Sequence, residues 1–372
     1  MTTASGLLVS VSSRIGTTPV SRLSRAHAWL NRRPARRAIL GDRTADAARA
    51  MPPNPLTGTL AMPIKLGANL AEPALTSRHA RLAEAAGFDF VAAGEHLYRD
   101  ERPGPTQLAL TALAAAAGAT ERVRLLSSII ITPLHHPVML AKQSAVVDQI
   151  SGGRLTLGLG VGGEFPGEFR ALGIPLNERG PRTDEAIRIM RALWSGGPAS
   201  HAGRAFTFED VTLNPGPLQK GGPPIWVGGR TEAAMQRAAR SGDGWLPYLY
   251  RPSHYARSVD AIKGLLEKRG RSLDNFGFGL HLMTAIGATK EDSIRLAAPA
   301  LQAGYKYDGN YAELAERYVL LGPPDAAVTA LQQFHEAGAR DILLSWMTPS
   351  ESIEAQIEVV GKSVIPAIRT AS

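Results

Sequence analysis

The chain has 372 residues, of which 44% are hydrophobic, and it contains no cysteine. It therefore has enough apolar residues for a large core, whereas disulfides, thiolate nucleophiles and metal sites with cysteine ligands are excluded. Most of the formal charge of +8 lies in residues 1–61, which contain nine arginines, no lysine and two aspartates, so the remaining chain is close to neutral and lacks the basic face expected of a DNA-binding domain.

Residues 1–61 are rich in Ser, Thr, Arg, Ala and Pro and show little periodicity. We predict that this arginine-rich extension is disordered and that the folded domain spans residues 62–372, with Met62 as a candidate functional start. A regulatory or nucleic-acid-binding arm and a targeting peptide are the alternatives. Arg36 and Arg37 resemble a twin-arginine signal, but no apolar segment of about 7 to 15 residues follows them. Because no run of about 18 apolar residues occurs either, we expect a cytoplasmic protein without membrane or nucleic-acid partners.

From Met62 onward, short apolar runs alternate with segments of helical periodicity. Eight runs are predicted as buried strands: 63–70, 88–96, 123–132, 154–165, 224–229, 243–249, 276–287 and 340–345. Eight parallel strands connected by helices close a (β/α)₈ barrel, so the predicted fold is an α/β TIM-like barrel. Two stretches, Glu164–Gly222 and Ala297–Leu321, exceed simple crossovers and are predicted as insertions at the carboxyl-terminal mouth of the barrel.

The stretch RLTLGLGVGGEF, residues 154–165, contains the spacing G-x-G-x-x-G of dinucleotide-binding turns. Such a turn belongs to the first strand of its domain and enters a helix directly. Here the glycines end the fourth predicted strand, and we expect Pro166 and Gly167 to interrupt any immediate helix. The glycines are therefore interpreted as a strand end where backbone must approach another group closely, or as simple relief of crowding.

Several longer motifs together resemble the luciferase-like monooxygenase family, and most of all its deazaflavin (coenzyme F420)-dependent branch. They are LAEAAGFDFVAAGEH, LLSSIIITPLHHPVMLAKQSAVVDQISGGRLTLGLGVGGE, EFRALGIPLNERGPRTDEAIRIMRALWSG and PPIWVGGRTEAAMQRAARSGDGWLP. The resemblance runs from about Met62 to the end and is strongest between Leu82 and Pro247. Val147 departs from it, because leucine is usual before the aspartate.

The resemblance implies a TIM-like barrel, with an insertion near the seventh strand, that binds a deazaflavin or flavin at its mouth. The leading hypothesis is an oxidoreductase that transfers hydride between coenzyme F420 and a small organic substrate. The alternative is an FMN-dependent monooxygenase that uses O₂ and reduced flavin from a separate reductase, and a third is a non-catalytic flavin-binding barrel. Members of the family commonly form dimers, so a homodimer is expected.

Glu95 and His96 end the second predicted strand, and Glu164 follows the glycines of the fourth. A carboxylate and an imidazole at a barrel mouth can supply general acid/base catalysis. Because side chains alternate along a strand, we expect only one of the first two to face the site, and we choose His96. All three residues are predicted as catalytic candidates, Glu164 by resemblance.

Predicted cofactor contacts come from three strand ends. By resemblance, the third strand runs beneath the cofactor's central ring, and we expect an unusual peptide bond, a bulge or a non-prolyl cis bond, at Ser128–Ile129. The loop VGGRT ends a strand in paired glycines and opens a helix that Thr231 can cap, a geometry that favours phosphate. The complete set of cofactor candidates is Ser128, Ile129, Thr132, Gly162, Gly163, Gly228, Gly229, Arg230 and Thr231. His135 and His136 show no ligand spacing with other residues, so no metal is expected.

Overall fold

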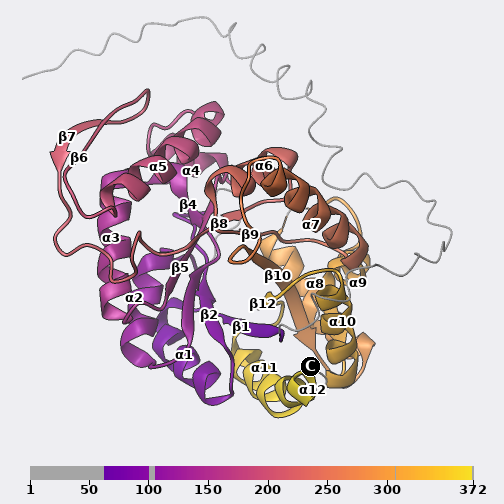
Figure 1. The fold of residues 1–372 in the computed structure, drawn as a ribbon. Coiled ribbons are helices and arrows are strands. Elements are labelled where there is room, and N and C mark those ends of the chain that lie inside the picture. The colour runs from indigo at the N-terminus through magenta and orange to yellow at the C-terminus, as the bar shows by residue number, and fades with distance from the viewer. Residues whose placement is uncertain (1–62, 100–104, 306, 371–372) are drawn as a thin grey trace, which may run out of the picture. The chain divides into compact units, whose positions relative to one another are not determined.

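A computed structural model describes residues 63–99, 105–305 and 307–370. The residues of the predicted extension, 1–61, lie outside these ranges. In the described part of the chain, eight parallel strands close into a barrel (Figure 1), which confirms the predicted fold. The strands are β1 (Lys65–Asn69), β2 (Phe90–Ala93), β3 (Arg124–Ser127) with its continuation β4 (Ile130–Ile131), β5 (Leu155–Gly160), β8 (Ile225–Gly228), β9 (Gly244–Leu246), β10 (Gly277–Ile286) and β12 (Asp341–Trp346).

The strands are neighbours in the order β10, β12, β1, β2, β3, β5, β8 and β9, and pairing of β9 with β10 closes the ring. Each strand is buried on both faces, which explains why the strands read as continuous apolar runs in the sequence. The barrel interior is filled by a separate cluster of side chains: Phe90, Ala92, Leu126, Trp226, Leu246 and Leu343. An ion pair between Arg124 and Asp341 lies at the amino-terminal end of this interior.

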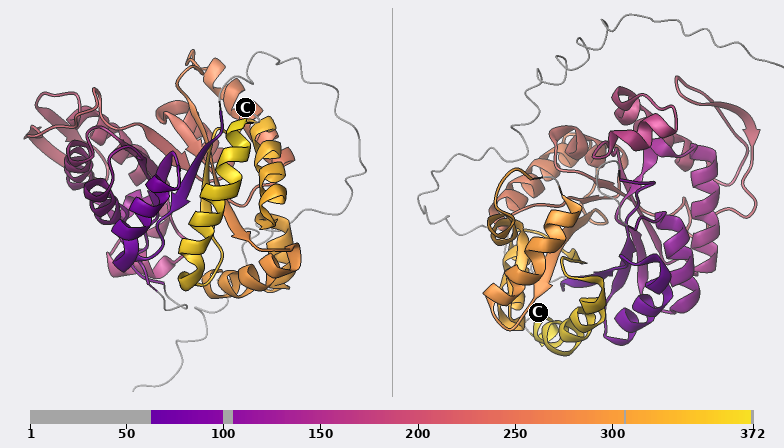
Figure 2. Two further views of the ribbon diagram at one scale, coloured as in Figure 1. Left: turned by 90° about the horizontal axis from the view of Figure 1, so that it is seen from below. Right: turned by 180° about the vertical axis from the view of Figure 1, so that it is seen from behind.

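Helices surround the barrel in the views of Figure 1 and Figure 2. They are α1 (Thr76–Ala85), α2 (Ala109–Ala119), α3 (Pro137–Ile150), α4 (Pro166–Ala171), α5 (Arg179–Leu193), α6 (Glu232–Ser241), α7 (Pro252–Glu267), α8 (Lys290–Gly304), α9 (Tyr311–Tyr318), α10 (Pro324–Glu336), α11 (Ile353–Val359) and α12 (Ile365–Thr370). Local sequence sets several starts, since Pro137 opens α3 and the Thr231 hydroxyl caps α6 by accepting from the Ala234 N–H. No helix in the described ranges is both long and apolar enough to cross a membrane.

The two predicted insertions contain helices and strands of their own, and the short strands were not predicted from the sequence. The first forms α4, α5 and an antiparallel hairpin of β6 (Ala199–Ala202) and β7 (Thr207–Val211). The second contains the end of α8, α9 and a strand, β11 (Val319–Gly322), that pairs with the last residues of β10 outside the barrel. These strands are four or five residues long, too short for periodicity to distinguish them from loop.

One local expectation was wrong. We expected Pro166 and Gly167 to interrupt any helix after the glycines, but α4 begins at Pro166 itself. Proline is tolerated in the first helical turn because its missing N–H would have no intrahelical partner there. The conclusion that this is no dinucleotide-binding turn is unaffected, because the glycines belong to the fourth strand of a barrel.

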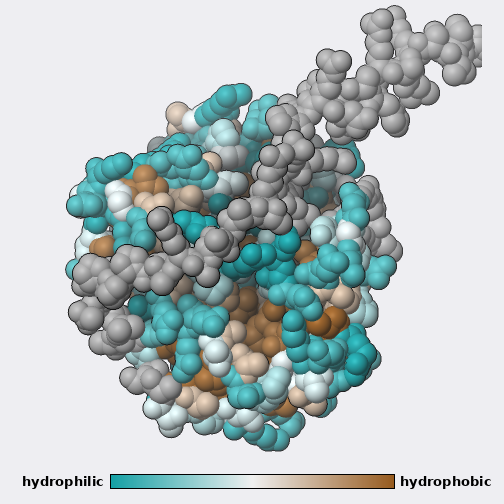
Figure 3. Space-filling model, turned by 90° about the vertical axis from the view of Figure 1, so that its right-hand side faces the viewer, coloured by the Kyte–Doolittle hydropathy of each residue, from teal (hydrophilic) through white to brown (hydrophobic). Residues whose placement is uncertain are grey.

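The side of the molecule that carries α7 to α10 is shown in Figure 3. Apolar side chains gather in a hollow on this face, and hydrophilic side chains frame them. The face is therefore mixed in hydropathy.

The close approach of β3 and β5 requires a glycine at position 158. The Ser127 hydroxyl donates to the Gly158 carbonyl (2.9 Å) and accepts from the Gly158 N–H (2.8 Å). A Cβ atom on Gly158 would lie 2.0 Å from the Ser127 carbonyl oxygen, which is backbone and cannot move aside cheaply. The first glycine of the motif is thus explained by a strand-to-strand contact.

We predict that Gly158→Ala lowers the free energy of unfolding by about 3 kcal/mol, because the new methyl group overlaps fixed backbone. Gly118→Ala is the matched control, since nothing lies within 4 Å of its added Cβ and alanine favours the helix. Urea unfolding followed by circular dichroism measures both variants. Equal midpoints for the two variants would contradict the explanation.

Candidate functional site

The predicted site residues come together at the carboxyl-terminal end of the barrel. They follow β2, β3, β5 and β8, four neighbouring strands of a parallel sheet whose ends meet on one side. The sequence analysis placed them there because all of them end strands. What the structure adds is the partner of each side chain.

Ser128 and Ile129 join β3 to β4 through a cis peptide bond, as predicted. The Ile129 side chain extends over two neighbouring strands: a Cβ on Gly160 of β5 would lie 1.8 Å from its Cδ1 atom, and a Cβ on Gly228 of β8 would lie 3.0 Å from its Cγ2 atom. The glycines therefore leave room for one isoleucine. Ile129 is partly exposed, so this packing leaves an apolar side chain at the mouth.

The Ser128 hydroxyl has a partner that the sequence analysis missed. It lies 2.9 Å from Nδ1 of His281, on β10. Gly277 and Gly279 of the same strand face Trp226 in the barrel interior, so His281, two residues further along, faces inward as well. Burial lowers the pKa of His281 from 6.5 to about 4. The alternation G-x-G-x-H was the only signal in the sequence, and it becomes informative once the inward face of β10 is known.

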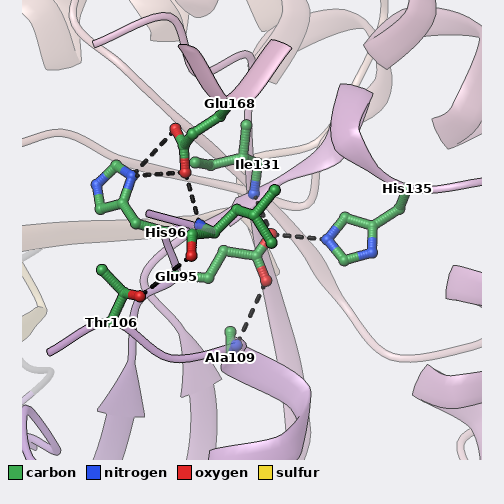
Figure 4. A network of polar contacts seen from close by, with 8 residues as sticks. Glu95, His96, Thr106, Ala109, Ile131, His135 and Glu168 are labelled. Atoms are coloured by element: carbon green, nitrogen blue, oxygen red, sulfur yellow. Dashed lines mark hydrogen bonds and ion pairs between the residues drawn. The ribbon is translucent and has the colours of Figure 1, made fainter. Parts of the chain in front are cut away.

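Glu95 connects several elements, as Figure 4 shows. Its carboxylate accepts from the N–H of Ile131 (2.8 Å) and of Ala109 (3.3 Å), and Nε2 of His135 lies 2.7 Å away. The residue is only 7% exposed. These contacts hold the end of β2 against β4 and the start of α2, so the carboxylate has few lone pairs left for a ligand.

His96 points to a different partner (Figure 4). Its Nδ1 atom lies 3.3 Å from both carboxylate oxygens of Glu168, which is completely buried on α4 and also accepts from the Leu97 N–H at 2.6 Å. The Phe165 ring packs edge-on against the imidazole, with centroids 4.8 Å apart. Glu168 was not singled out from the sequence. The indication available in the sequence was its spacing: Glu168 follows Glu164 by four residues, about one helical turn.

Glu164 lies at the mouth, as expected from its position after the glycines. The side chain is exposed, yet the walls of the mouth desolvate its carboxyl group enough to raise the pKa. The charges of His96 and Arg99 oppose this rise, whereas Glu168 adds to it. Gly162 and Gly163, with φ of 60° and 104°, turn the chain from β5 toward Glu164 and α4.

Thr132 follows β4 and is fully buried, and its hydroxyl has no hydrogen-bond partner among the described residues.

The loop after β8 has the geometry expected of an anion seat. Gly229 has a φ of 109°, and its carbonyl accepts from the Trp245 indole N–H at 2.8 Å. Thr231 caps α6, whose first N–H groups point toward the mouth side of the loop. The Arg230 guanidinium lies over the Tyr248 ring, 5.5 Å from its centroid. Within the described ranges no cluster of His, Asp and Glu could hold a metal ion.

Comparisons with known proteins match this architecture. The model of the luciferase-like monooxygenase family matches residues 59–344. An FMNH₂-dependent dimethylsulfone monooxygenase of Pseudomonas putida is 32% identical over 191 residues, 50% of each chain, so this chain spans half of that enzyme. An F420-dependent glucose-6-phosphate dehydrogenase of Microbacterium testaceum is 26% identical over 317 residues, 77% of this chain and 91% of the enzyme.

Among solved structures, an F420-dependent secondary alcohol dehydrogenase in complex with an F420–acetone adduct has a TM-score of 0.70. It is 21% identical and covers 83% of this chain and 100% of its own. This similarity shows the shared barrel fold.

The neutral, buried state of His281 generates a prediction about pH. The unfolded chain binds a proton at this histidine below about pH 6.5, whereas the native chain does so only near pH 4. The free energy of unfolding should therefore fall as pH falls from 6.5 toward 4. We predict that His281→Gln reduces this loss: urea unfolding at pH 5 and pH 8 should show a smaller difference for the variant. An equal difference in both proteins would contradict the prediction.

Proposed function

The chain belongs to the luciferase-like monooxygenase family, and from this premise we propose that it is a coenzyme F420-dependent oxidoreductase that transfers hydride to or from a small organic substrate. The observation that carries the proposal is the arrangement at the mouth. The Ile129 side chain, packed over Gly160 and Gly228, belongs to a strand end that lies in the barrel order between the end of β2, which carries His96, and the loop that starts α6. A planar cofactor with a phosphate needs these features.

The residues present fit such a cofactor. The amino terminus of α6 offers free N–H groups and the positive end of the helix dipole to a phosphate, and Arg230 adds a fixed charge. Ile129 offers an apolar face on which a ring system can lie. Bound there, a deazaflavin supplies a hydride carrier that does not activate oxygen. The other predicted contacts, Ser128, Thr132, Gly162, Gly163, Gly229 and Thr231, surround this seat as secondary candidates.

We assign the acid/base role to His96. With Nδ1 directed at the Glu168 carboxylate, Nε2 is the ring nitrogen left to exchange a proton with the substrate. Glu168 acts as a positioning residue, because its contacts with Nδ1 and with the Leu97 N–H fix both the ring and the backbone behind it. Glu95 and its partner His135 hold the strand end from the other side. Glu164, with its raised pKa, is a second candidate acid.

An FMN-dependent monooxygenase is the second candidate function. It is favoured by the 32% identity to the dimethylsulfone monooxygenase of Pseudomonas putida, and it would require reduced flavin from a separate reductase. The same seat would hold FMN through its phosphate. The expected homodimer also stays a prediction; the outward side of α3 exposes Met139, Val146 and Ile150, apolar surface that a second copy would cover.

Binding of the full-length chain to the deazaflavin coenzyme and to FMN, each oxidised and reduced, separates the two candidates. Tryptophan fluorescence reports the binding, since the Trp245 indole N–H donates to the Gly229 carbonyl in the seat. We predict tighter binding of the deazaflavin, weakened about tenfold or more by Arg230→Ala, because a charge-assisted contact to phosphate is lost. Arg240→Ala, which removes the same charge at the far end of α6, is the control. A preference for reduced FMN would move the protein to the oxygenase branch.

The role of His96 has its own test. His96→Asn should lower kcat by about 10² to 10⁴, the usual contribution of a positioned acid or base, while coenzyme affinity changes little. Glu168→Gln should lower kcat less, since the imidazole remains. His136→Asn, exposed outside the mouth, serves as control. Turnover is followed at the coenzyme's absorbance with a panel of small alcohols, aldehydes and acids, and full turnover by His96→Asn would refute the assignment.

A further inference from the structure

Beside the proposed cofactor seat, three side chains that the sequence analysis did not single out meet at the mouth. Arg99 follows β2, Tyr248 follows β9, and Tyr305 ends α8 in the second insertion. Tyr248 and Tyr305 pack against one apolar cluster, and the charges of Arg99 and Glu164 act on Tyr305, so these residues face the same part of the mouth. Of the three, Tyr248 also lies under the Arg230 guanidinium of the phosphate loop.

Arg99 is incompletely satisfied. Its side chain is half-buried, and its Nε atom is inaccessible to solvent and has no hydrogen-bond partner in the described part of the chain. Burying a guanidinium N–H without an acceptor costs free energy, because water is lost and nothing replaces it. A ligand that brings an acceptor to this position would recover that loss.

Glu164, the nearby acid, does not serve as that acceptor. Among the described residues no ion pair or hydrogen bond joins it to Arg99. Desolvation raises the pKa of Glu164, which favours its neutral form and weakens it as a counterion. Among the described residues, the positive charge of Arg99 is therefore left without an ion-paired carboxylate.

The two tyrosines add hydroxyl donors on a fixed frame. Both rings pack in one apolar cluster with Met283, and the Tyr311 hydroxyl donates to the Tyr305 carbonyl at 2.9 Å. Burial raises the pKa of Tyr248 and of Tyr305 above the ordinary value of 10, so both phenols stay protonated and can donate. No hydrogen bond occupies either hydroxyl within the described residues.

We propose that Arg99, with the hydroxyls of Tyr248 and Tyr305, forms an anion subsite that binds the carboxylate of a small organic acid. A planar carboxylate suits the guanidinium fork, and the tyrosine rings suit an apolar or aromatic body attached to it. That this acid is the substrate rests on the proposed function; the subsite itself does not. The substrate class is then carboxylate-bearing compounds, oriented by Arg99 on the side of the mouth opposite the phosphate loop.

The test uses sodium benzoate and its neutral isostere benzamide as probes, titrated by calorimetry into the full-length chain without cofactor. We expect saturable benzoate binding, and binding of benzamide weaker by about tenfold or more, since only benzoate carries the charge. Arg99→Gln should weaken benzoate binding by about tenfold or more, and Arg99→Lys by less, because lysine keeps the charge but not the fork. Tyr305→Phe should weaken it by about threefold.

Two matched controls remove a charge elsewhere. One control is Arg122→Gln, just before the amino-terminal end of β3, and the other is Arg240→Gln, in the last turn of α6; both should leave benzoate affinity within about twofold. The proposal is overturned if wild type binds no benzoate, if benzamide binds as well as benzoate, or if Arg230→Gln abolishes binding while Arg99→Gln does not. Circular dichroism establishes that each variant is folded. Failure of the proposed function would appear separately, as no binding of deazaflavin or FMN.

Discussion

The mouth of the barrel depends on one packing contact, the side chain of Ile129 lying across Gly160 and Gly228 on the two neighbouring strands. Any Cβ at position 160 would overlap this side chain, so the glycines and the isoleucine require each other. The same segment directs the Ser128 hydroxyl toward His281 and the Ile131 N–H toward Glu95. The floor of the site and the bonds that hold its rim therefore share a single backbone segment.

Three glutamates at the mouth differ because their surroundings differ. Glu95 is bound by two backbone N–H groups and His135, and these contacts make it a structural anchor. Glu168 is buried yet bonded to the Leu97 N–H and directed at His96, so it can orient an imidazole. Glu164 has no such bonds with the residues that the structure describes, and desolvation raises its pKa. A carboxylate that is free of structural contacts is the one that chemistry can use.

The second insertion gives this barrel a wall that the shared fold does not dictate. α8 and α9 hold Tyr305 and Tyr311 beside the strand ends, and β11 attaches the segment to β10. A barrel supplies the cofactor seat through its strand ends, whereas insertions near the mouth decide what lies beside the cofactor. The anion subsite proposed for Arg99 follows that division, since it combines one strand-end residue with the inserted wall.

The sequence by itself determined the barrel, because eight buried strands alternating with helices leave few other closed arrangements, and it located Ser128, His96 and the loop of Arg230 at strand ends. It also predicted the cis bond at Ser128–Ile129, through family resemblance. Only the tertiary structure decided which side chains act on one another: Glu168 contacts His96, His281 contacts Ser128, and the charge of Arg99 acts on Tyr305. These pairs are separated by 72, 153 and 206 residues in the chain. Local patterning carries strand and helix periodicity, but it carries no information on contacts between distant segments, which the closure of the barrel alone establishes.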